Sequence, residues 1–461
     1  MSKMTWREKC YRRKRLNCVR HTTLDPKGPG VLRMHLIPPG TDSAKDPFLL
    51  LLNGAQLIPV NLSWAVLLTC FMDCLERFAG REMEENEWED AVCFAAKQAR
   101  KVYPGTPVTQ LQEELHLMLR SLMDIAAGCE PEVEVAVLSL GEYADKMSAP
   151  HRMDLMISAM TREGNWHCNQ KCLHCYAAGQ PMGETMELDT QAWKDLLEKL
   201  RRANIPQVTF TGGEPTMRDD LVELVAAAQW FVTRLNTNGR LLTKQLCDEL
   251  YEASLDSVQV TLYSAEESVH NLLVGTSGFQ DTVSGIRNAL EAGLIVSINT
   301  PLCSSNRNYA DTLRFAHSLG VRYATCSGLI PSGNAMNEGS IATRLSAEEL
   351  KRTLQEAVTV AGELGMELDF TSPGWLEEEE LRSMGLQLIP SCGACLSNMA
   401  VTPDGKVVPC QSWLGGVVLG DLCTDEWRAI WKSAACGEIR RESAKMEHIC
   451  QLRISNVRKE G

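Results

Sequence analysis

The sequence predicts an α/β protein in three parts: a winged-helix-like module, a partial (β/α)6 barrel and a small cysteine-rich metal-binding domain. Three observations predict this class. A hairpin pattern precedes three helical patterns, short apolar runs then alternate with amphipathic helices, and the C-terminal part is rich in cysteine but poor in long apolar runs. We expect the module at residues 1–130, a linker at 131–150, the barrel at 151–375 and the C-terminal domain at 385–461.

Composition excludes several classes of protein. The chain has 461 residues, of which 44% are hydrophobic and 23% charged, and roughly 100–200 residues per domain gives two to four domains. The formal charge of −13 argues against a nucleic-acid partner. No apolar run approaches the roughly 20 residues of a membrane span, and the N-terminus lacks a signal peptide's apolar core. We therefore expect a cytoplasmic protein without a membrane partner, whose 18 cysteines are reduced and serve metal binding more readily than disulfides.

The N-terminal module is predicted from one hairpin and three helices. Two apolar runs, 48–52 and 55–60, flank Asn53 and Gly54, which is a strong hairpin signal. The first helix is expected to begin at an Asn61 cap, and apolar periodicity predicts two more at about 84–102 and 109–127.

The middle of the chain alternates strands and helices, which implies a parallel sheet with right-handed crossovers. About six units are fewer than a closed eight-unit barrel needs, so we expect an open or partial barrel. The expected strands are 154–159, 208–211, 233–237, 257–262, 295–299 and 323–326; the expected helices are 190–203, 219–228, 244–253, 282–292, 309–319 and 347–364.

Three thiols stand directly after the first predicted strand of the barrel. Cys168, Cys172 and Cys175 lie within eight residues and can hold three irons of an iron–sulfur cube, which leaves the fourth iron open. The alternative is a zinc knuckle, although a second cysteine pair or a Cys/His partner pattern is missing nearby.

A second motif, Thr211-Gly212-Gly213-Glu214-Pro215, follows the second predicted strand. Together the two motifs resemble the radical S-adenosylmethionine (SAM) superfamily, and the resemblance continues through segments 236–239, 262–264, 270–279 and 301–306. It implies that Cys168, Cys172 and Cys175 ligate a [4Fe–4S] cluster whose open iron binds SAM, and that the His174 ring lies beside the adenine. The reduced cluster of such enzymes splits SAM, and the resulting 5′-deoxyadenosyl radical abstracts hydrogen from an unactivated C–H bond.

Further SAM contacts are expected at the ends of the strands. Gly212 and Gly213 allow a close approach of the backbone, and Glu214 can accept a hydrogen bond from the SAM ammonium group. Polar residues at the C-terminal ends of strands either bind ligands or cap the helix that follows, and three qualify: Asn238, Ser264 and Asn306. No general acid or base is singled out.

The C-terminal cysteines form a second constellation. Cys392 and Cys395 precede a short hairpin on which Cys410 follows a glycine with four residues between. This pattern resembles the SPASM/twitch extension of radical SAM enzymes and implies an auxiliary [4Fe–4S] cluster, with Cys450 expected as fourth ligand and Cys436 or Cys423 as alternatives. The later dense cysteine run of the full SPASM pattern is absent, which argues against a second auxiliary cluster. A structural zinc ion is the other interpretation.

The function expected from these features is peptide modification. The N-terminal module resembles the peptide-recognition module of the pyrroloquinoline-quinone chaperone type, in which a leader peptide adds to a strand edge, here 48–52 or 55–60. The enzyme would abstract hydrogen from a ribosomally made precursor peptide and install a thioether or C–C cross-link, with a flavodoxin or ferredoxin as electron donor. One alternative is a radical SAM enzyme with another substrate, either a maturase of a folded protein or a small-molecule oxidoreductase, in which the N-terminal module is only a scaffold. The other is a non-catalytic Fe–S redox sensor.

Overall fold

The computed structural model describes residues 4–24, 32–39, 46–53, 56–76, 83–126, 129–132, 147–386, 388–445 and 449–453. The chain divides into two compact units, Met1–Ser148 and Ala149–Gly461. Gly54 of the predicted hairpin turn and most of the predicted linker lie outside the described residues.

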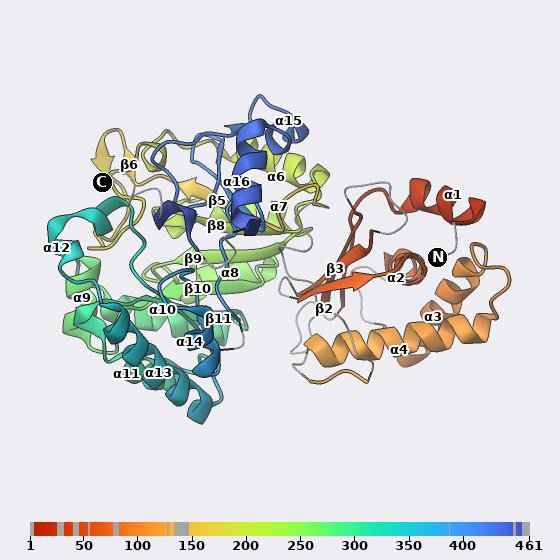
Figure 1. The fold of residues 1–461 in the computed structure, drawn as a ribbon, viewed down its shortest axis with the longest axis horizontal. Helices are drawn as coiled ribbons and strands as arrows, with labels where there is room; N and C mark the ends of the chain where they lie inside the picture. Colours follow the sequence, from red (N-terminus) through yellow and green to blue (C-terminus); the bar gives the residue numbers. More distant parts are fainter. Residues whose placement is uncertain are drawn as a thin grey trace. The chain divides into compact units, whose positions relative to one another are not determined.

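The first unit is a four-stranded antiparallel sheet packed against helices (Figure 1). Its sheet order is β1-β2-β3-β4. The elements are α1 (Trp6–Arg15), β1 (Arg20–Leu24), β2 (Leu32–Ile37), β3 (Phe48–Leu52), β4 (Gln56–Val60), α2 (Leu62–Leu75), α3 (Glu85–Ala99) and α4 (Val108–Ala126).

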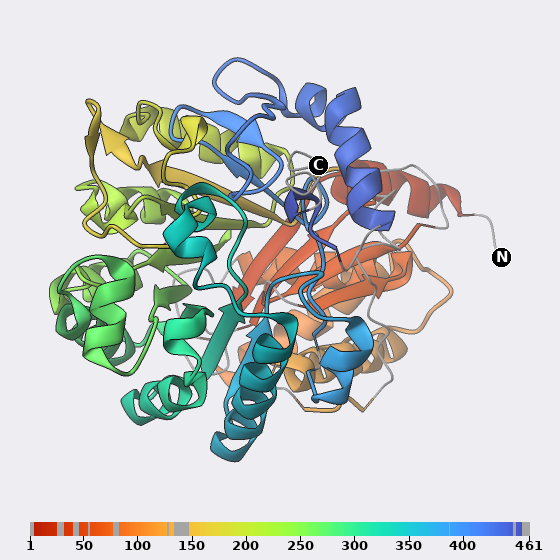
Figure 2. The ribbon, with the colours of Figure 1, turned by 60° about the vertical axis from the view of Figure 1, so that its left-hand side comes forward.

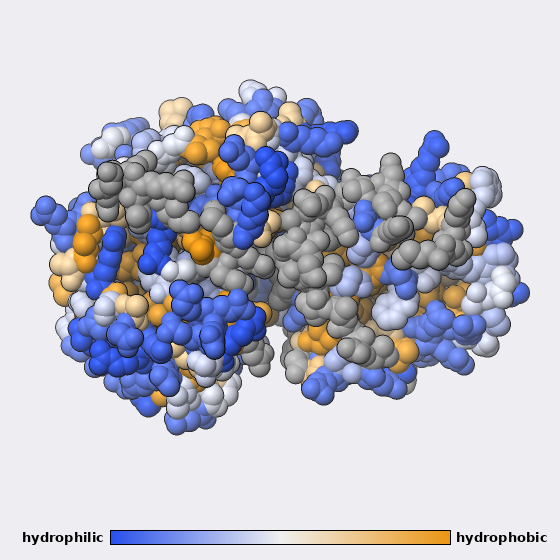
Figure 3. All heavy atoms as spheres, viewed as in Figure 1, coloured by the Kyte–Doolittle hydropathy of each residue, from blue (hydrophilic) through white to orange (hydrophobic). Residues whose placement is uncertain are grey.

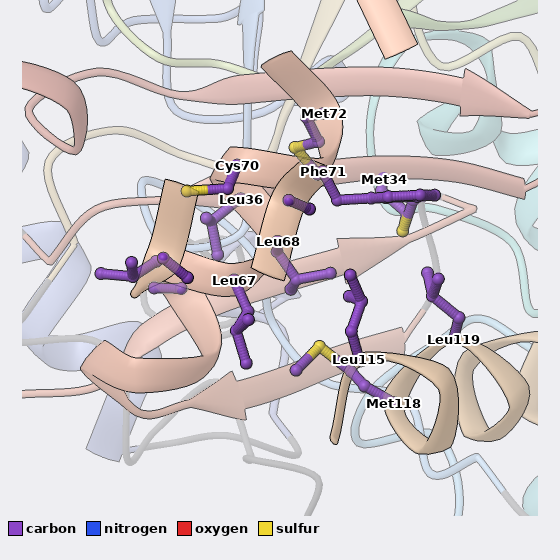
Figure 4. Close-up of a cluster of buried hydrophobic side chains, with 14 of the residues drawn as sticks. Met34, Leu36, Leu67, Leu68, Cys70, Phe71, Met72, Leu115, Met118 and Leu119 are labelled. Carbon is purple, nitrogen blue, oxygen red and sulfur yellow. The ribbon is translucent and has the colours of Figure 1, made fainter. Parts of the chain in front are cut away.

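The predicted hairpin and the three helices after it are confirmed. Asn61 caps α2, because its side chain accepts a hydrogen bond from the Trp64 N–H at 2.9 Å. Leu68 and Phe71 of α2 share one buried cluster with Met34 of β2 and Leu115 of α4 (Figure 4). The sequence did not predict α1, β1 or β2, since α1 is highly charged and arginine and histidine interrupt the apolar residues of β2.

The strand 48–52 is not an edge, which corrects one of the two predicted docking strands. β3 lies between β2 and β4, so only β4 of the hairpin is an edge strand. The Asn53 N–H bonds to the Arg33 carbonyl of β2 at 2.9 Å. Because successive residues of a strand point their backbone groups to opposite sides, Leu57 and Pro59 direct theirs away from β3. Pro59 has no N–H, so Leu57 is the donor that β4 offers outward among its described residues.

The other edge of this sheet is β1. By the same alternation, Arg33 faces β3, so the β2 residues Leu32, Met34 and Leu36 face β1. The Thr23 backbone of β1 therefore points away from β2. Unlike Pro59, Thr23 has an N–H as well as a carbonyl to present.

The second unit contains a ten-stranded sheet in the order β13-β12-β11-β10-β9-β8-β5-β14-β15-β16 (Figure 2). The strands from β5 to β13 run parallel, which confirms the six predicted strands and adds β13. The bounds are β5 (Arg152–Ser158), β8 (Gln207–Gly212), β9 (Val232–Thr237), β10 (Ser257–Thr261), β11 (Ile295–Pro301), β12 (Tyr323–Ser327), β13 (Glu367–Phe370), β14 (Asn398–Val401), β15 (Lys406–Val408) and β16 (Gly420–Asp421). β14 pairs in parallel with β5, so the cysteine-rich segment continues the sheet of the barrel.

The six predicted helices of this unit are confirmed, and several short elements join them. The helices are α6 (Thr190–Arg202), α7 (Leu221–Ala227), α8 (Lys244–Glu252), α9 (Glu267–Val274), α10 (Phe279–Glu291), α11 (Tyr309–Leu319), α12 (Glu338–Ile341), α13 (Ala347–Leu364), α14 (Glu378–Ser383), α15 (Trp427–Trp431) and α16 (Ala434–Lys445). The 3-10 helices are η3 (Pro181–Gly183), η4 (Pro215–Met217), η5 (Ser304–Asn306) and η6 (Gly333–Met336); β6 (Thr161–Arg162) and β7 (Asn165–Trp166) form a small hairpin.

The outer helices are amphipathic. α10 contacts β10 and β11, and α13 contacts β13, each through a buried face. Their outer positions are polar; Arg352, Gln355 and Glu356 of α13 are exposed, and the surface over α11 and α13 is hydrophilic in Figure 3. None of the helices in the described ranges is long and apolar enough to cross a membrane.

Candidate active site

The first cysteine loop follows β5 after the β6–β7 hairpin, an insertion that the sequence did not predict. Two separate elements, β7 and α9, hold the loop. The Trp166 indole of β7 donates to the Gln170 carbonyl at 2.8 Å. The Lys171 and Leu173 N–H groups donate to the C-terminal turn of α9 at 3.0 and 2.9 Å. The loop is therefore braced by hydrogen bonds before any ligand is considered.

Close backbone approaches fix the same loop. Gly275, which ends α9 with φ +68°, lies so near the loop that a Cβ would stand 2.4 Å from the Lys171 carbonyl oxygen. At Gly333 (φ +56°) a Cβ would meet the Cys175 and Tyr176 carbonyl oxygens at 2.5 Å. The Asn334 N–H then donates to the Cys175 carbonyl at 2.9 Å. Both glycines are required by position as well as by backbone conformation.

The three thiols of this loop lie in mostly apolar surroundings. Cys168 and Cys175 adjoin a cluster that contains Met156 and Met160, and Cys172 packs against Tyr263. Burial raises the pKa of Cys168 to about 12, and it also raises the pKa of Cys172 and Cys175. Thiolates here need a compensating positive centre, which bound iron supplies.

The donor set fits a cluster better than a single ion. Electrostatic repulsion from Cys175 raises the pKa of Cys168 and of Cys172, and Cys168 also raises that of Cys172, so the three thiols lie near one another. Within the described ranges, no three His, Cys, Asp or Glu side chains are arranged to hold one metal ion. A cube binds each ligand to a different iron and so accepts more widely spaced thiols. The assignment of Cys168, Cys172 and Cys175 as its ligands stays a prediction.

The glycine motif ends β8 beside the end of β5. Gly212 has φ +127°, and a Cβ there would stand 2.1 Å from the Ser158 carbonyl oxygen. A Cβ on Gly213 would stand 2.7 Å from the Ala159 carbonyl oxygen. These glycines therefore allow two strand ends to meet, a role that the sequence did not predict. Contact with SAM through the same backbone stays a prediction.

Glu214 is almost completely buried and already accepts several hydrogen bonds. Its Oε1 accepts from Thr216 N–H at 3.0 Å and from the Thr216 and Thr237 hydroxyls, each at 2.6 Å. Its Oε2 accepts from the Asn238 N–H at 2.8 Å. Burial raises the pKa of Glu214, and these hydrogen bonds oppose that effect. Each carboxylate oxygen has two lone pairs, and Oε2 accepts a single bond, so Oε2 retains capacity for an ammonium group.

The other predicted SAM contacts, Asn238, Ser264 and Asn306, already make hydrogen bonds within the protein. Asn238 Nδ2 donates to Asn169 Oδ1 at 2.6 Å, which ties the end of β9 to the cysteine loop. Ser264 Oγ accepts from the Glu266 N–H at 3.0 Å in a turn just before α9, whose N-cap is Glu266. Asn306 Nδ2 donates to two carbonyls and its Oδ1 accepts from the Cys303 N–H, so it joins the loops after β10 and β11. Their contact with SAM stays a prediction.

His174 is buried with one ring nitrogen unused. Its Nε2 bonds to Thr343 Oγ1 at 2.8 Å, and its Nδ1 has no hydrogen-bond partner among the described residues. Its ring lies 6.1 Å from that of Tyr263. Burial lowers the pKa of His174 to about 4, so the ring is neutral at pH 7. A flat, neutral ring with a free nitrogen suits the predicted place beside the adenine.

Several residues that sequence reasoning missed complete the site. Arg240 donates to the Asn169 carbonyl at 2.7 Å, and Ser340 donates to the Leu173 carbonyl at 2.8 Å. Arg218, which follows the glycine motif, bonds the Ile157 carbonyl at 2.9 Å and pairs with Asp220 at 2.7 Å. The position of Arg240 directly after 236–239, a segment already noted, was the one available signal.

In the C-terminal group of cysteines, three of the four predicted ligands lie near one another: Cys392, Cys410 and Cys450. Cys410 lies within electrostatic reach of Cys392 and Cys450, and burial raises its pKa to about 12. Cys450 also faces Cys392. The Cys450 N–H donates to the Pro373 carbonyl at 3.3 Å, which anchors the C-terminal segment after β13. Ser443 of α16 contacts Cys392 Sγ at 3.8 Å.

Cys395, the remaining predicted ligand of this cluster, has a thiol partner of its own. The Cys395 and Cys436 thiols are hydrogen-bonded, which raises the pKa of Cys395 and lowers that of Cys436. Arg440 stacks 3.9 Å above the Trp431 ring and donates to Cys436 Sγ at 3.6 Å. Cys395 also lies within electrostatic reach of Cys410. Cys423 is exposed and lies within electrostatic reach of Asp421, Lys199 and Asp404 rather than of these thiols, so the structure separates this alternative from the group.

Iron content distinguishes these candidates for the fourth ligand. We expect Cys450→Ala to lose the auxiliary cluster, about four irons per chain, because Cys450 faces both Cys392 and Cys410. Cys423→Ala is the matched control and should retain full iron. The measurement is iron and sulfide content after anaerobic reconstitution. Full iron in Cys450→Ala together with loss in Cys436→Ala would contradict the assignment.

Two family models match separate parts of the chain. Residues 167–319 match the Radical SAM superfamily, and residues 392–452 match the SPASM iron–sulfur cluster-binding domain. The chain thus carries a radical SAM domain, which implies a [4Fe–4S] cluster and SAM as cofactors. A SPASM domain follows it and implies an auxiliary iron–sulfur cluster.

Particular relatives cover different shares of the chain. The AdoMet-dependent heme synthase of Oleidesulfovibrio alaskensis is 27% identical over 295 residues, 59% of this chain and 74% of that protein. The mycofactocin maturase MftC of Mycobacterium tuberculosis is 27% identical over 294 residues, 61% of this chain and 72% of that protein. The crystal structure of Streptococcus suis SuiB bound to precursor peptide SuiA matches with a TM-score of 0.59 at 14% identity, over 91% of this chain and 90% of SuiB. The last likeness is one of fold.

Proposed function

We propose that this enzyme is a maturase of a ribosomally made precursor peptide. The first unit would bind the leader of the peptide, and the barrel would present a core residue to the cluster end of the sheet. The bound cluster and SAM would supply a 5′-deoxyadenosyl radical that abstracts hydrogen from that residue. The substrate radical would then form a thioether or C–C bond with a second group of the peptide, which would release a proton, and the auxiliary cluster would take up the remaining electron. A flavodoxin or ferredoxin would deliver the electron that cleaves SAM.

The observation that carries the proposal is the extent of the fold likeness. The likeness to SuiB, a protein solved with its precursor peptide, spans nine-tenths of both chains. The sequence matches to the heme synthase and to MftC cover about three-fifths of this chain. MftC, named for maturation, adds support for peptide modification from sequence. A heme synthase relative keeps a small-molecule substrate as the rival.

The first unit has the backbone groups that an added strand requires. Thr23 of β1 directs its N–H and carbonyl away from β2, and Leu57 of β4 directs its own away from β3. A small pocket beside the end of β4 is lined by residues that include Arg12, Phe48 and Pro59. Main-chain hydrogen bonds would supply affinity, and such a pocket would select a side chain of the leader.

The enzyme's own residues would position and enclose the reaction. The braced cysteine loop and the buried Glu214 hold the strand ends in place, so the reacting groups meet a preorganised site. Tyr176, next to Cys175, bonds Gln411 in the segment after Cys410 at 3.3 Å. This contact links the surroundings of the two cysteine centres and would help to exclude water between them.

The test uses the short peptide encoded beside the gene, labelled for fluorescence anisotropy with the full chain. We expect binding that Thr23→Pro or Leu57→Pro weakens by about tenfold or more, because each proline removes an outward N–H. Thr23→Val and Leu57→Val keep the N–H and are the matched controls. The edge whose proline variant fails identifies the docking strand.

Two outcomes would contradict the proposal. Absence of peptide binding by the unmodified chain would favour the small-molecule rival. Binding without a peptide product that has lost hydrogen, after reduction with dithionite in the presence of SAM, would contradict catalysis on the peptide. The sensor alternative is separated by 5′-deoxyadenosine, which only an active radical SAM enzyme releases.

A further inference from the structure

The parallel sheet of the second unit has one polar face. Covered parallel sheets bury both faces and are apolar on each. Here Leu235, Val258 and Ile298 are buried on the helix side, while the alternate positions of the same strands are polar. These alternate positions include Asp154, Thr209, Arg234, Asn236, Gln259, Asn299, Thr325 and Asp369.

Much of this polar face is internally hydrogen-bonded, but some atoms are not. Gln259 Nε2 donates to Thr325 Oγ1 at 3.2 Å, and Thr325 Oγ1 donates to Asn299 Oδ1 at 2.9 Å. In contrast, Asp154 Oδ2 and Asn236 Oδ1 are buried and have no hydrogen-bond partner within the described ranges. Asp154 is 1% exposed. Unpartnered buried oxygens are costly, so their retention indicates that a ligand or ordered water satisfies them.

Arg234 is the cation at the centre of this face. It lies in the middle of β9, beside Thr209 and Ser257 of the flanking strands, and its side chain is exposed although helices cover the opposite face. It makes no hydrogen bond or ion pair with any described residue. Asp154 and Asp369 lie within electrostatic reach, but Asp154 is held by Arg152 at 3.0 Å, and no ion pair joins Asp369 to Arg234.

A guanidinium in such a place stays charged and presents a planar set of donors. Its best partner is a carboxylate, which matches that plane with two hydrogen bonds. Arg234 precedes Thr237, the last residue of β9, by three residues, or about 10 Å along the strand. A group bound there would leave an adjoining part of the substrate near the cluster end of the sheet.

We propose that Arg234 anchors a carboxylate of the substrate. The inference rests on the proposed function, and the carboxylate then belongs to the core of the precursor peptide, either as an Asp or Glu side chain or as the C-terminus. The partnerless oxygens of Asp154 and Asn236 would accept hydrogen bonds from N–H groups of the same peptide. Arg234 is thus a residue for positioning and specificity, separate from the cysteine centres.

The experiment uses the full enzyme and the peptide encoded beside the gene in three forms: native, C-terminally amidated, and with core Asp and Glu replaced by Asn and Gln. The variants are Arg234→Gln and Arg234→Lys, and Arg287→Gln, an exposed arginine on α10, is the matched control. Each is assayed for kcat and KM of peptide modification and for release of 5′-deoxyadenosine without peptide.

We expect Arg234→Gln to raise KM for the native peptide about 10- to 100-fold, the effect of losing a charge-assisted pair. The KM of Arg234→Lys should lie between those of the unmodified enzyme and of Arg234→Gln, because lysine keeps the charge but loses the planar pair of hydrogen bonds. Peptide-free release of 5′-deoxyadenosine should stay within about twofold of the unmodified enzyme. The peptide form that lacks the anchored carboxylate should bind the unmodified enzyme more weakly than the native peptide does. Arg234→Gln should bind that form and the native peptide equally well. The form that behaves in this way identifies which carboxylate Arg234 binds.

Three results would overturn the inference. One is an unchanged KM in Arg234→Gln, and another is an equal penalty for carboxylate removal in Arg234→Gln and in the unmodified enzyme. The third is loss of peptide-free 5′-deoxyadenosine release in both Arg234 variants, which would make the residue structural. If the unmodified enzyme binds none of the peptide forms, the proposed function itself fails, which is a distinct outcome.

Discussion

Cys172→Ala is expected to reduce the formation of 5′-deoxyadenosine to the level of cluster-free protein. The cube would lose one of three protein ligands in a site whose burial already disfavours free thiolates. Cys410→Ala is expected to keep a part of this activity, about a tenth to a half, because Cys410 belongs to the second group of thiols. The measurement is 5′-deoxyadenosine release by each anaerobically reconstituted variant under dithionite.

The matched control is Cys18→Ala, which removes an exposed thiol outside both groups and should behave as the unmodified enzyme. Equal and complete loss in Cys172→Ala and Cys410→Ala would contradict separate roles for the two cysteine groups. Substantial release by Cys172→Ala would contradict its assignment as a ligand of the SAM-binding cluster.

Gly212→Ala is expected to destabilise the second unit by about 3–5 kcal/mol. The backbone at φ +127° disfavours any side chain, and the new Cβ would stand 2.1 Å from the Ser158 carbonyl oxygen, a backbone atom that cannot move without shifting β5. SAM binding should weaken with it, because Glu214 follows two residues later. Urea denaturation followed by circular dichroism measures the first effect.

Gly362→Ala provides the control for this glycine substitution. Gly362 lies in α13, and a Cβ there would meet nothing within 4 Å. Alanine in such a helical position is expected to stabilise the chain by about 0.5–1 kcal/mol. Similar effects of the two substitutions would show that the strand ends of β5 and β8 do not meet as closely as described.

Local sequence signals predicted the barrel well. The strands β5, β8 and β9 are short and alternate with amphipathic helices, and this order implies parallel pairing. β13 was missed because ELDF places two acidic residues in a four-residue strand. β2 was missed for a similar reason, since its buried Arg33 and His35 interrupt the apolar pattern.

The site was predictable where chemistry lies in contiguous residues and not where it depends on tertiary contacts. The cysteine loop and the glycine motif are local, and their residue spacing is informative. The four donors around Glu214 come from two loops that only the folded sheet brings together. The hydrogen bond between the Cys395 and Cys436 thiols joins residues that have forty others between them in the chain, and no local sequence pattern predicts it. Polar residues alternate along the parallel strands around Arg234, and this pattern is visible in the sequence. The same pattern is equally typical of a sheet face in contact with water, so it does not predict a binding site.

We propose that the thiolates of Cys168, Cys172 and Cys175 hold an iron cube with one iron free for SAM. The most direct test is the electron paramagnetic resonance spectrum of the anaerobically reconstituted, dithionite-reduced enzyme, recorded with and without SAM. We expect SAM to change the signal of one cluster, and methionine and 5′-deoxyadenosine to accumulate together. Zinc in place of iron at Cys168, Cys172 and Cys175, or a cluster signal indifferent to SAM, would contradict the account.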